Sequence, residues 1–196
     1  MARGEDTKAE ILKEAMAQAS KYGLEGISIG GLAKSLGLSK SGLFAHFNSL
    51  ENLQLEVLQA TVNRFVEVVV IAALKQPRGE PRVRALFKNL LDWTNSKWMP
   101  GGCLLMSAAD EFDDRPGPVR DFLVKNHQDL MSTILTAAKI AVDEGHFRAD
   151  LDLEQFAFDA FAIFLSYHHY KRLLNDPNAE AHFNNSVDRL IKNCCQ

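Results

Sequence analysis

Residues 28–47 read SIGGLAKSLGLSKSGLFAHF, and they contain two short helical patterns separated by one glycine. Ser28 and Ser39 are good N-cap residues, and each precedes apolar residues at helical spacing. Gly37 stands between the two patterns and can adopt the left-handed conformation that ends a helix. Two helices joined by a short turn containing glycine are typical of a helix-turn-helix, whose second helix enters the major groove of DNA. We therefore predict that this stretch binds DNA.

The outward side of the second helix is small and polar, which suits close packing in a groove. Leu43 and Phe47 are predicted to face the core, with Phe44 beside them. Amides, hydroxyls and a lysine at the helix starts are expected to contact phosphates, and the following turn is expected to face base edges. The predicted DNA-binding residues are Ser28, Ser39, Lys40, Ser41, Gly42, Phe44, Ala45 and His46. A merely structural helical hairpin is the less favoured alternative, because an exposed glycine and two serines gain nothing for helix stability.

The composition is ordinary for a soluble globular protein, with 46% apolar and 24% charged residues among 196. The formal net charge is −3, whereas a DNA-binding protein usually carries a basic face. Residues 1–47 hold six basic and five acidic side chains, a net charge of +1. Any positive face must therefore arise from segregation of charges rather than from an excess.

No targeting or redox signal stands out. The longest apolar run, Val68–Leu74, is far too short to span a membrane, and the N-terminus lacks a signal-peptide core. Three cysteines, Cys103, Cys194 and Cys195, form neither a disulfide framework nor a zinc-binding spacing. We expect a cytoplasmic protein with reduced thiols, without membrane association.

The remaining chain alternates helical patterns with loops and shows no convincing strand. A capping box at Thr7 and Glu10 predicts a first helix whose apolar stripe reaches Tyr22, preceded by a loose arm at Ala2–Asp6. Further helices are predicted over 50–74, 82–98, 103–112, 119–144, 153 onward, and 179–193. The predicted fold is all-α with about nine helices: an N-terminal three-helix helix-turn-helix domain, 1–47, and a C-terminal helical bundle, 48–196.

The chain resembles the TetR/AcrR family of transcriptional regulators. The resemblance is strongest over Thr7–Leu53, in Thr7-Lys-Ala-Glu-Ile-Leu12, in Ser28 with Leu32-Ala33, and in Gly37-Leu38-Ser39-Lys40 followed by Leu43-Phe44 and His46-Phe47. It implies a homodimer formed through the last two helices, a ligand-binding C-terminal bundle, and repression relieved by a small molecule. The expected partners are thus a double-stranded, pseudo-palindromic DNA operator, a mostly apolar effector and a second copy of the chain.

Two positions depart from the family pattern. Phe44 stands where the family most often has a phosphate-contacting tyrosine, and Leu50 stands where a lysine commonly makes the same kind of contact. Both changes remove backbone contacts, which carry affinity rather than sequence information. Each lost charge neutralisation flattens the dependence of log K on log salt by about 0.9. We therefore expect weaker and less salt-sensitive binding than is usual in the family.

The C-terminal region is rich in aromatic and thioether side chains, and such an excess can leave an apolar cavity with a few polar anchors. His127, His168 and Cys103 are the expected anchors. The predicted ligand-binding residues are Trp93, Trp98, Cys103, Met106, Phe122, His127, Met131, Phe161, Phe164 and His168. Most large side chains of this kind serve simply as core.

The residues also bear on three other functions. Cys103 follows two glycines at a predicted helix start, where helix amides favour a reactive thiolate, so an electrophile- or oxidant-sensing regulator is the runner-up. An all-α small-molecule carrier is less favoured. An enzyme is not expected, because no nucleophile–base set or phosphate loop is visible, and no cofactor is predicted. No metal site is expected either, because the adjacent His168 and His169 point to different sides of a helix.

Overall fold

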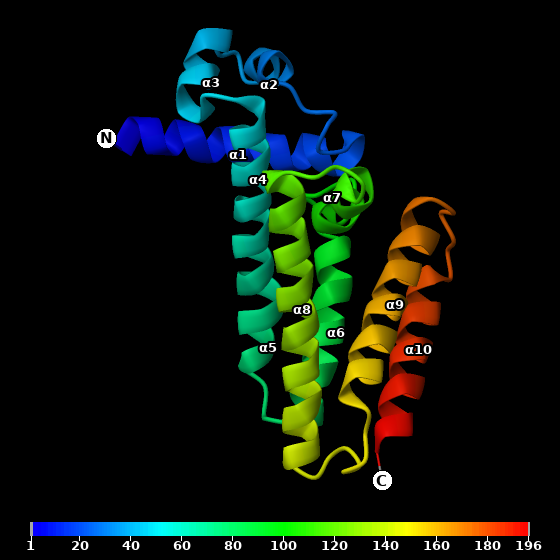
Figure 1. Cartoon of the computed structure of the whole chain (residues 1–196). Coiled ribbons are helices and arrows are strands. Elements are labelled where there is room, and N and C mark those ends of the chain that lie inside the picture. Colours follow the sequence, from blue (N-terminus) through cyan, green and yellow to red (C-terminus); the bar gives the residue numbers. More distant parts are fainter. Residues whose placement is uncertain (1, 196) are drawn as a thin grey trace. The chain divides into compact units, whose positions relative to one another are not determined.

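The computed structural model describes the backbone of residues 2–195 and the side chains of residues 6–195 (Figure 1). Within these residues the chain forms nine helices and no strand, which confirms the all-α prediction. The chain divides into two compact units. Unit 1 comprises Met1–Arg64 and Asn95–Lys125, and unit 2 comprises Phe65–Thr94 and Asn126–Gln196.

Unit 1 contains the predicted helix-turn-helix. Its helices are α1 (Ala2–Tyr22), α2 (Ile29–Ser35), α3 (Lys40–Phe47), nearly all of α4 (Leu50–Phe65), α7 (Leu104–Phe112) and the start of α8 (Pro118–Asp143). Ile11, Ala15, Leu32 and Leu43 are fully buried, and Phe47 is 1% exposed. Helix α1 contacts both α2 and α7, so it braces the motif as expected from its apolar stripe.

The turn between α2 and α3 has the predicted geometry. Gly37 adopts a φ of 66°, in the left-handed region. The Leu38 amide donates to the Ala33 carbonyl at 2.8 Å, and the Gly37 amide donates to the Lys34 carbonyl at 3.3 Å. This pair of hydrogen bonds is a Schellman motif, which closes the end of α2 and directs the chain into α3.

The start of α1 was predicted wrongly. The helix begins at Ala2, not at a capping box formed by Thr7 and Glu10, so Ala2–Asp6 are helical rather than a loose arm. Tyr22 was assigned to the apolar stripe but is 70% exposed. It is the last residue of α1, where a helix periodicity taken from the sequence no longer determines which side faces the core.

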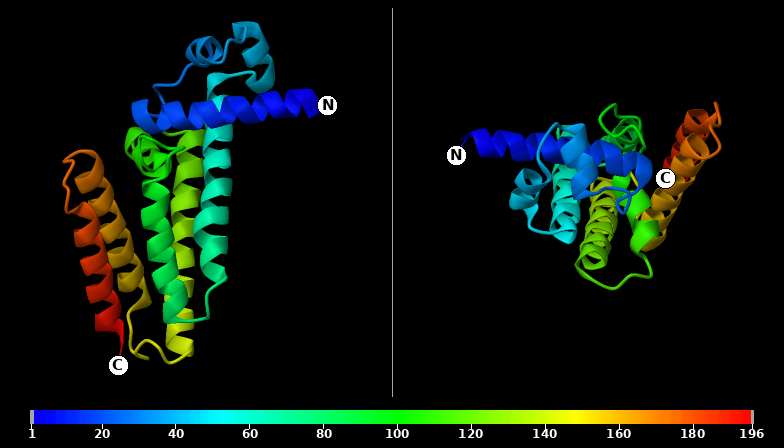
Figure 2. Two further views of the ribbon diagram at one scale, coloured as in Figure 1. Left: turned by 180° about the vertical axis from the view of Figure 1, so that it is seen from behind. Right: turned by 90° about the horizontal axis from the view of Figure 1, so that it is seen from above.

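Unit 2 is a bundle around its own apolar core. The long helix of residues 50–74 continues into this unit as a π-helical turn, η1 (Val66–Ile71), and a final α-helical turn, α5 (Ala72–Leu74). It is followed by α6 (Glu80–Thr94), most of α8, α9 (Leu153–Arg172) and α10 (Ala179–Cys194). Figures 1 and 2 show α9 and α10 running antiparallel and side by side. Tyr167 and Phe87 both pack edge-on against Phe183, with ring centroids 5.2 Å and 6.3 Å apart.

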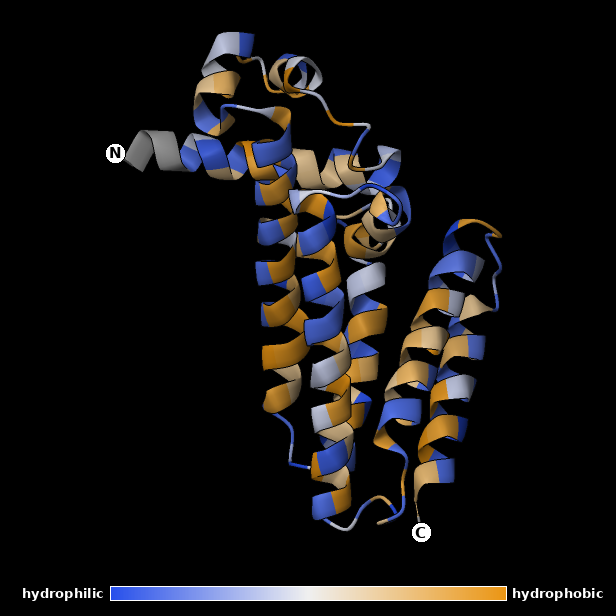
Figure 3. Ribbon diagram, in the orientation of Figure 1, coloured by the Kyte–Doolittle hydropathy of each residue, from blue (hydrophilic) through white to orange (hydrophobic). Residues whose placement is uncertain are grey.

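The helix Leu50–Leu74 becomes strongly hydrophobic toward its C-terminal end (Figure 3). Among the described residues it is the one helix long and apolar enough to cross a membrane, with a mean hydropathy of 1.7 in its most apolar window, of which 33% is buried. A core helix of a soluble protein passes the same test, so one such helix is weak support for membrane insertion.

Other helix boundaries follow the predictions closely. The Asp152 carboxylate accepts the Gln155 amide at 2.9 Å and caps α9 as expected. Helix α6 ends at Thr94, so Trp98 lies in the loop beyond it rather than in the predicted helix 82–98. The compact units do not coincide with the predicted domains, because residues 95–125 belong to the same unit as the N-terminal helices. The predicted domain boundary at residue 47 therefore stays a prediction.

Candidate nucleic-acid interface and cavities

Helix α3 presents a continuous exposed surface. Lys40, Ser41, Gly42 and Ala45 are exposed, whereas Leu43 and Phe47 are buried beneath them as predicted. His46 is half-buried. Small side chains on the exposed side let the backbone of this helix approach another surface closely, which is the shape that a major groove accepts.

Two serines cap the helices of the motif. The Ser28 hydroxyl accepts the Gly31 amide at 3.0 Å at the start of α2, and the Ser39 hydroxyl accepts the Gly42 amide at 3.0 Å at the start of α3. Both serines are exposed. The remaining amides of each first helical turn lack partners within the helix, so they are oriented donors for an anion such as phosphate.

Phe44 is 49% exposed on α3 rather than packed beside the core residues, and Leu50 is 39% exposed at the start of α4. At these two positions the resemblance led us to expect phosphate-contacting side chains. Both are accessible to a partner of unit 1, and neither carries a charge or a hydroxyl.

The charges of the motif are distributed unevenly. Lys34 and Lys40 are exposed and form no ion pair within the described residues. Lys8 is instead paired with Glu56 at 2.6 Å and lies 5.4 Å from the centre of the Phe47 ring. Lys34 and Lys40 are therefore available to neutralise phosphates, whereas Lys8 helps to hold α1 against its neighbours.

Glu111 ties α7 to the segment that enters the motif, a role that the sequence did not reveal. Its two carboxylate oxygens accept the Leu24 amide at 2.9 Å and the Glu25 amide at 3.0 Å. Arg115 pairs with Glu25, so a second contact holds this segment. Proximity of residues 24 and 111 arises only from folding, so no local pattern could have indicated this link.

A second link joins α1 to the loop before α7. The Gly101 amide donates to the Ser20 hydroxyl at 3.0 Å. A Cβ atom at Gly101 would lie 1.6 Å from the Ser20 carbonyl oxygen, so only glycine fits this close approach. Within unit 1, hydrogen bonds thus tie α7 to the segment that follows α1, and α1 to the loop that precedes α7.

The predicted ligand-binding residues are divided between the two units. Unit 1 holds Trp98, Cys103, Met106 and Phe122, and unit 2 holds Trp93, His127, Met131, Phe161, Phe164 and His168. Trp93, Cys103, Met106 and Phe164 are buried, and the other six are half-buried. The rings of His127 and Phe161 meet edge-on at 5.8 Å. This set stays a prediction.

Cys103 is 2% exposed at the N-cap of α7 and makes no side-chain cap hydrogen bond there. Reactive cysteines lie in partly exposed, electropositive surroundings, whereas buried cysteines are inert. The burial of its sulfur therefore favours the packing role over the thiol-sensing alternative.

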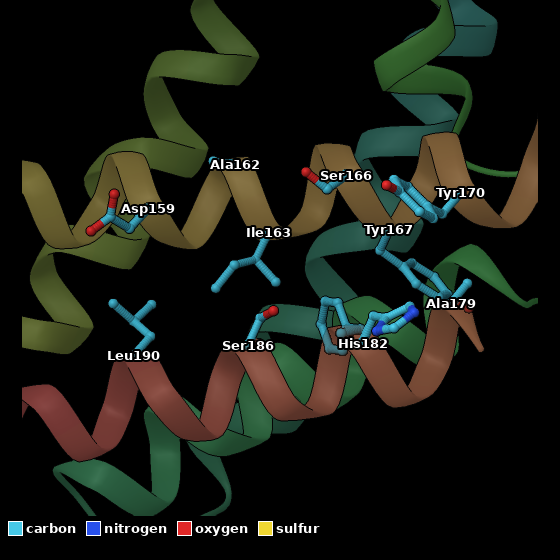
Figure 4. A pocket seen from close by; sticks show the side chains of 11 residues that line it. Asp159, Ala162, Ile163, Ser166, Tyr167, Tyr170, Ala179, His182, Ser186 and Leu190 are labelled. Carbon is cyan, nitrogen blue, oxygen red and sulfur yellow. The ribbon is translucent and has the colours of Figure 1, made fainter. Parts of the chain in front are cut away.

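Described residues of unit 2 line two hollows that bear on function. The first, the α9–α10 groove, measures about 570 Å³ and opens along the outer face of the last two helices (Figure 4). Ile163 projects from α9 toward Ser186 and Leu190 of α10, and the small Ala162 and Ser166 lie on the same wall.

The second hollow, the Arg82 cavity, measures about 270 Å³ and lies between the end of the long helix, the start of α6 and the middle of α8. Its apolar lining residues are Val70, Ala73, Leu74, Leu86, Ala137 and Ile140. Its polar lining residues are Arg82, Ser132, Thr133 and Thr136. None of these ten residues was predicted from the sequence to bind a ligand. In the sequence, Arg82 and the serine and threonine residues occupy ordinary polar positions of amphipathic helices.

The N-terminal and C-terminal halves both match models of one protein family. Residues 11–57 match the family of bacterial regulatory proteins, tetR family, and residues 79–187 match the tetracyclin repressor-like C-terminal domain. The chain belongs to the TetR family. It is accordingly a ligand-responsive, DNA-binding transcriptional repressor, and members of this family are soluble and generally non-enzymatic.

Solved structures of TetR-family regulators share the fold over nearly the whole chain. One from Chloroflexus aurantiacus has a TM-score of 0.86 at 21% identity, covering 98% of this chain and 96% of its own. One from Cytophaga hutchinsonii has a TM-score of 0.84 at 18% identity, covering 100% and 98%. AibR in complex with isovaleryl coenzyme A and operator DNA has a TM-score of 0.75 at 20% identity, covering 93% and 97%. No curated protein matches the sequence.

Proposed function

We propose that this TetR-family protein is a cytoplasmic homodimer that represses transcription by placing α3 of each subunit in the major groove of a pseudo-palindromic operator. The observation that carries the proposal is the exposed surface of α3, in which Lys40, Ser41, Gly42 and Ala45 surround a capped helix start. Two such helices read half-sites about one helical turn, or a multiple of it, apart. The protein acts by binding, without catalysis or a cofactor.

The contacts divide by chemistry. Ser28, Ser39 and Lys40, with the amides at the starts of α2 and α3, hold phosphates and set the orientation of the domain. Ser41, Ala45 and His46 face base edges, and Gly42 allows close approach. Phe44, exposed and apolar, is suited to a thymine methyl group or a sugar rather than to a phosphate.

A second copy of the chain is the proposed occupant of the α9–α10 groove. The groove is largely apolar, and large apolar side chains beside it are exposed, including Phe158 at 67%, Leu165 at 43% and Leu173 at 68%. Monomeric soluble proteins rarely leave a contiguous apolar surface of this kind open. The small Ala162, Ser166 and Ser186 let helices of the second copy approach closely.

Effector control requires that the ligand prefer the arrangement that does not bind DNA, with a typical coupling of about 1 to 3 kcal/mol. AibR, which shares the fold, was crystallised with isovaleryl coenzyme A and operator DNA. In this protein, movement of α7 would reach the motif through Glu111 and through the contact between Gly101 and Ser20. Of the predicted ligand contacts, the facing rings of His127 and Phe161 in unit 2 are a proposed place for an apolar ligand to pack.

Footprinting on the DNA upstream of the protein's own coding region, followed by a genome-wide binding screen, tests the proposed function. The expected result is a protected pseudo-palindrome that is lost with Lys40→Ala, whereas the matched variant Lys88→Ala on α6 in unit 2 retains it. Absence of any protected site, there or genome-wide, would contradict operator binding and favour a small-molecule carrier.

A further inference from the structure

The Arg82 cavity combines an apolar interior with an unpaired positive charge. Arg82 donates from Nε to the Gln76 carbonyl at 3.2 Å, and within the described residues it forms no ion pair. The two neighbouring arginines differ. Arg78 pairs with Glu144 at 2.7 Å, and Arg84 pairs with Glu80 at 2.7 Å. Of the three, Arg82 alone has no carboxylate partner among the described residues, and its Nη donors can serve another acceptor.

The α8 wall of the cavity offers further donors. Ser132 and Thr136 lie four residues apart on one side of α8, and their hydroxyls form no hydrogen bond within the described residues. Thr133 is already committed, since its hydroxyl donates to the Asp129 carbonyl at 2.8 Å. A polar ligand group entering the cavity thus meets a guanidinium and two available hydroxyls.

The opposite wall includes the π-helical turn. Val70, in η1, lines the cavity, and the carbonyl of the preceding Val69 accepts the Asn89 side-chain amide at 3.0 Å. A π-turn within an α-helix is rare and occurs frequently at functional sites. Its presence beside the cavity is independent of the Arg82 charge and points to the same place.

From these observations we propose that the Arg82 cavity binds a medium-chain aliphatic carboxylate. The carboxylate accepts hydrogen bonds from the Arg82 guanidinium, and the hydrocarbon chain packs against Ala73, Leu86 and Ile140. A volume of about 270 Å³ accommodates about nine non-hydrogen atoms, if each occupies about the 30 Å³ that a water molecule takes in the liquid. This size corresponds to a carboxylate of six to eight carbons.

The cavity is also a candidate effector site, and this regulatory role rests on the proposed repressor function. Ligand binding to the π-turn wall acts on the same continuous helix that begins at Leu50, directly after the helix-turn-helix. Binding of the carboxylate itself does not depend on that function.

Calorimetric titration of the full-length protein with octanoate tests the binding. Arg82→Gln is expected to weaken octanoate binding about tenfold or more, since a charge-assisted hydrogen bond to the carboxylate is lost. Octanol, which lacks the charge, should bind wild type and Arg82→Gln alike. Arg84→Gln, on the same helix but outside the cavity, removes the same charge and should leave octanoate affinity unchanged. Thr136→Phe, at the exposed rim, should obstruct both ligands.

No detectable octanoate binding at millimolar concentration, or equal affinity in wild type, Arg82→Gln and Thr136→Phe, would overturn the proposed site. A second measurement follows an operator complex during octanoate addition. Release in wild type but not in Arg82→Gln supports the effector role, and binding without release overturns that role alone. Failure of the ligand-free protein to bind any operator would instead count against the proposed function. The titrations would still decide whether the cavity binds octanoate.

Discussion

Leu50 is an exposed apolar residue at a position where a phosphate contact is expected. It is 39% exposed at the start of α4. We expect Leu50→Lys to tighten operator binding and to steepen the slope of log K against log salt by about 0.9 per subunit, since each lysine releases a condensed counterion. A salt titration by fluorescence anisotropy measures this slope. Ile71→Lys, which adds the same charge in unit 2, should leave it unchanged, and an unaltered slope for Leu50→Lys would show that this position does not meet the backbone.

Glycine is required at position 79 both by its backbone conformation and by the lack of space for a side chain. Its φ is 90°, and an added Cβ would lie 2.0 Å from Nδ1 of His146, the atom that accepts the Glu80 amide at 3.1 Å. Gly79→Ala should therefore lower the free energy of unfolding by about 1 to 3 kcal/mol. Gly145→Ala is the matched control, since Gly145 has a φ of 73° with no atom within 4 Å of the added Cβ. Urea denaturation should show the larger loss for Gly79→Ala; equal losses would mean that only backbone conformation matters.

Cys194 gives the protein a pH dependence at high pH. Burial raises the pKa of its thiol from 9.0 to about 11. The unfolded chain therefore releases this proton first, and the stability that the buried neutral thiol provides is lost as the pH rises from about 9 to about 11. Cys194→Ala should flatten the pH dependence of the urea midpoint in this range, and a midpoint curve identical to wild type would contradict the assignment.

At the scale of elements, the link between α7 and the entry to the motif is testable within unit 1. Glu111→Ala removes the acceptor for the Leu24 and Glu25 amides. We expect faster hydrogen exchange at these two amides and a loss of about 1 to 3 kcal/mol in stability. Asp113→Ala is the control, because the Asp113 carboxylate accepts the amide of its neighbour Asp114 and so makes a local contact. Unchanged exchange at residues 24 and 25 would mean that the carboxylate does not hold this turn.

Element existence was predictable, and element ends were less so. Ser28, Gly37 and Ser39 determine α2 and α3 by local hydrogen bonding, so their pattern sufficed. The capping signal at Thr7 predicted the wrong start for α1, because a helix continues through a possible cap residue when the preceding residues also favour helix. The local pattern does not decide between these two outcomes. The π-turn at Val66–Ile71 left no recognisable signal in a run of β-branched residues.

At the scale of the whole molecule, the proposed dimer depends on the α9–α10 groove. Ser186→Arg places a long charged side chain in this largely apolar groove, so we expect a monomer and a large loss of operator affinity. Size-exclusion chromatography with light scattering measures the mass. Asn184→Arg, on the same helix outside the groove lining, should remain dimeric; a dimeric Ser186→Arg would place the interface elsewhere.

The sequence by itself determined the helical architecture, the helix-turn-helix and the exposure of Lys40, Ser41, Gly42 and Ala45 on α3, but not the exposure of Phe44. These features depend on periodicity, caps and one glycine, which act over a few residues. Only the tertiary structure showed that Arg82, beside an apolar cavity, has no carboxylate partner among the described residues, and that Glu111 holds the Leu24 and Glu25 amides. Such features depend on which distant side chains meet, and helix periodicity places a residue on a face without specifying what that face contacts.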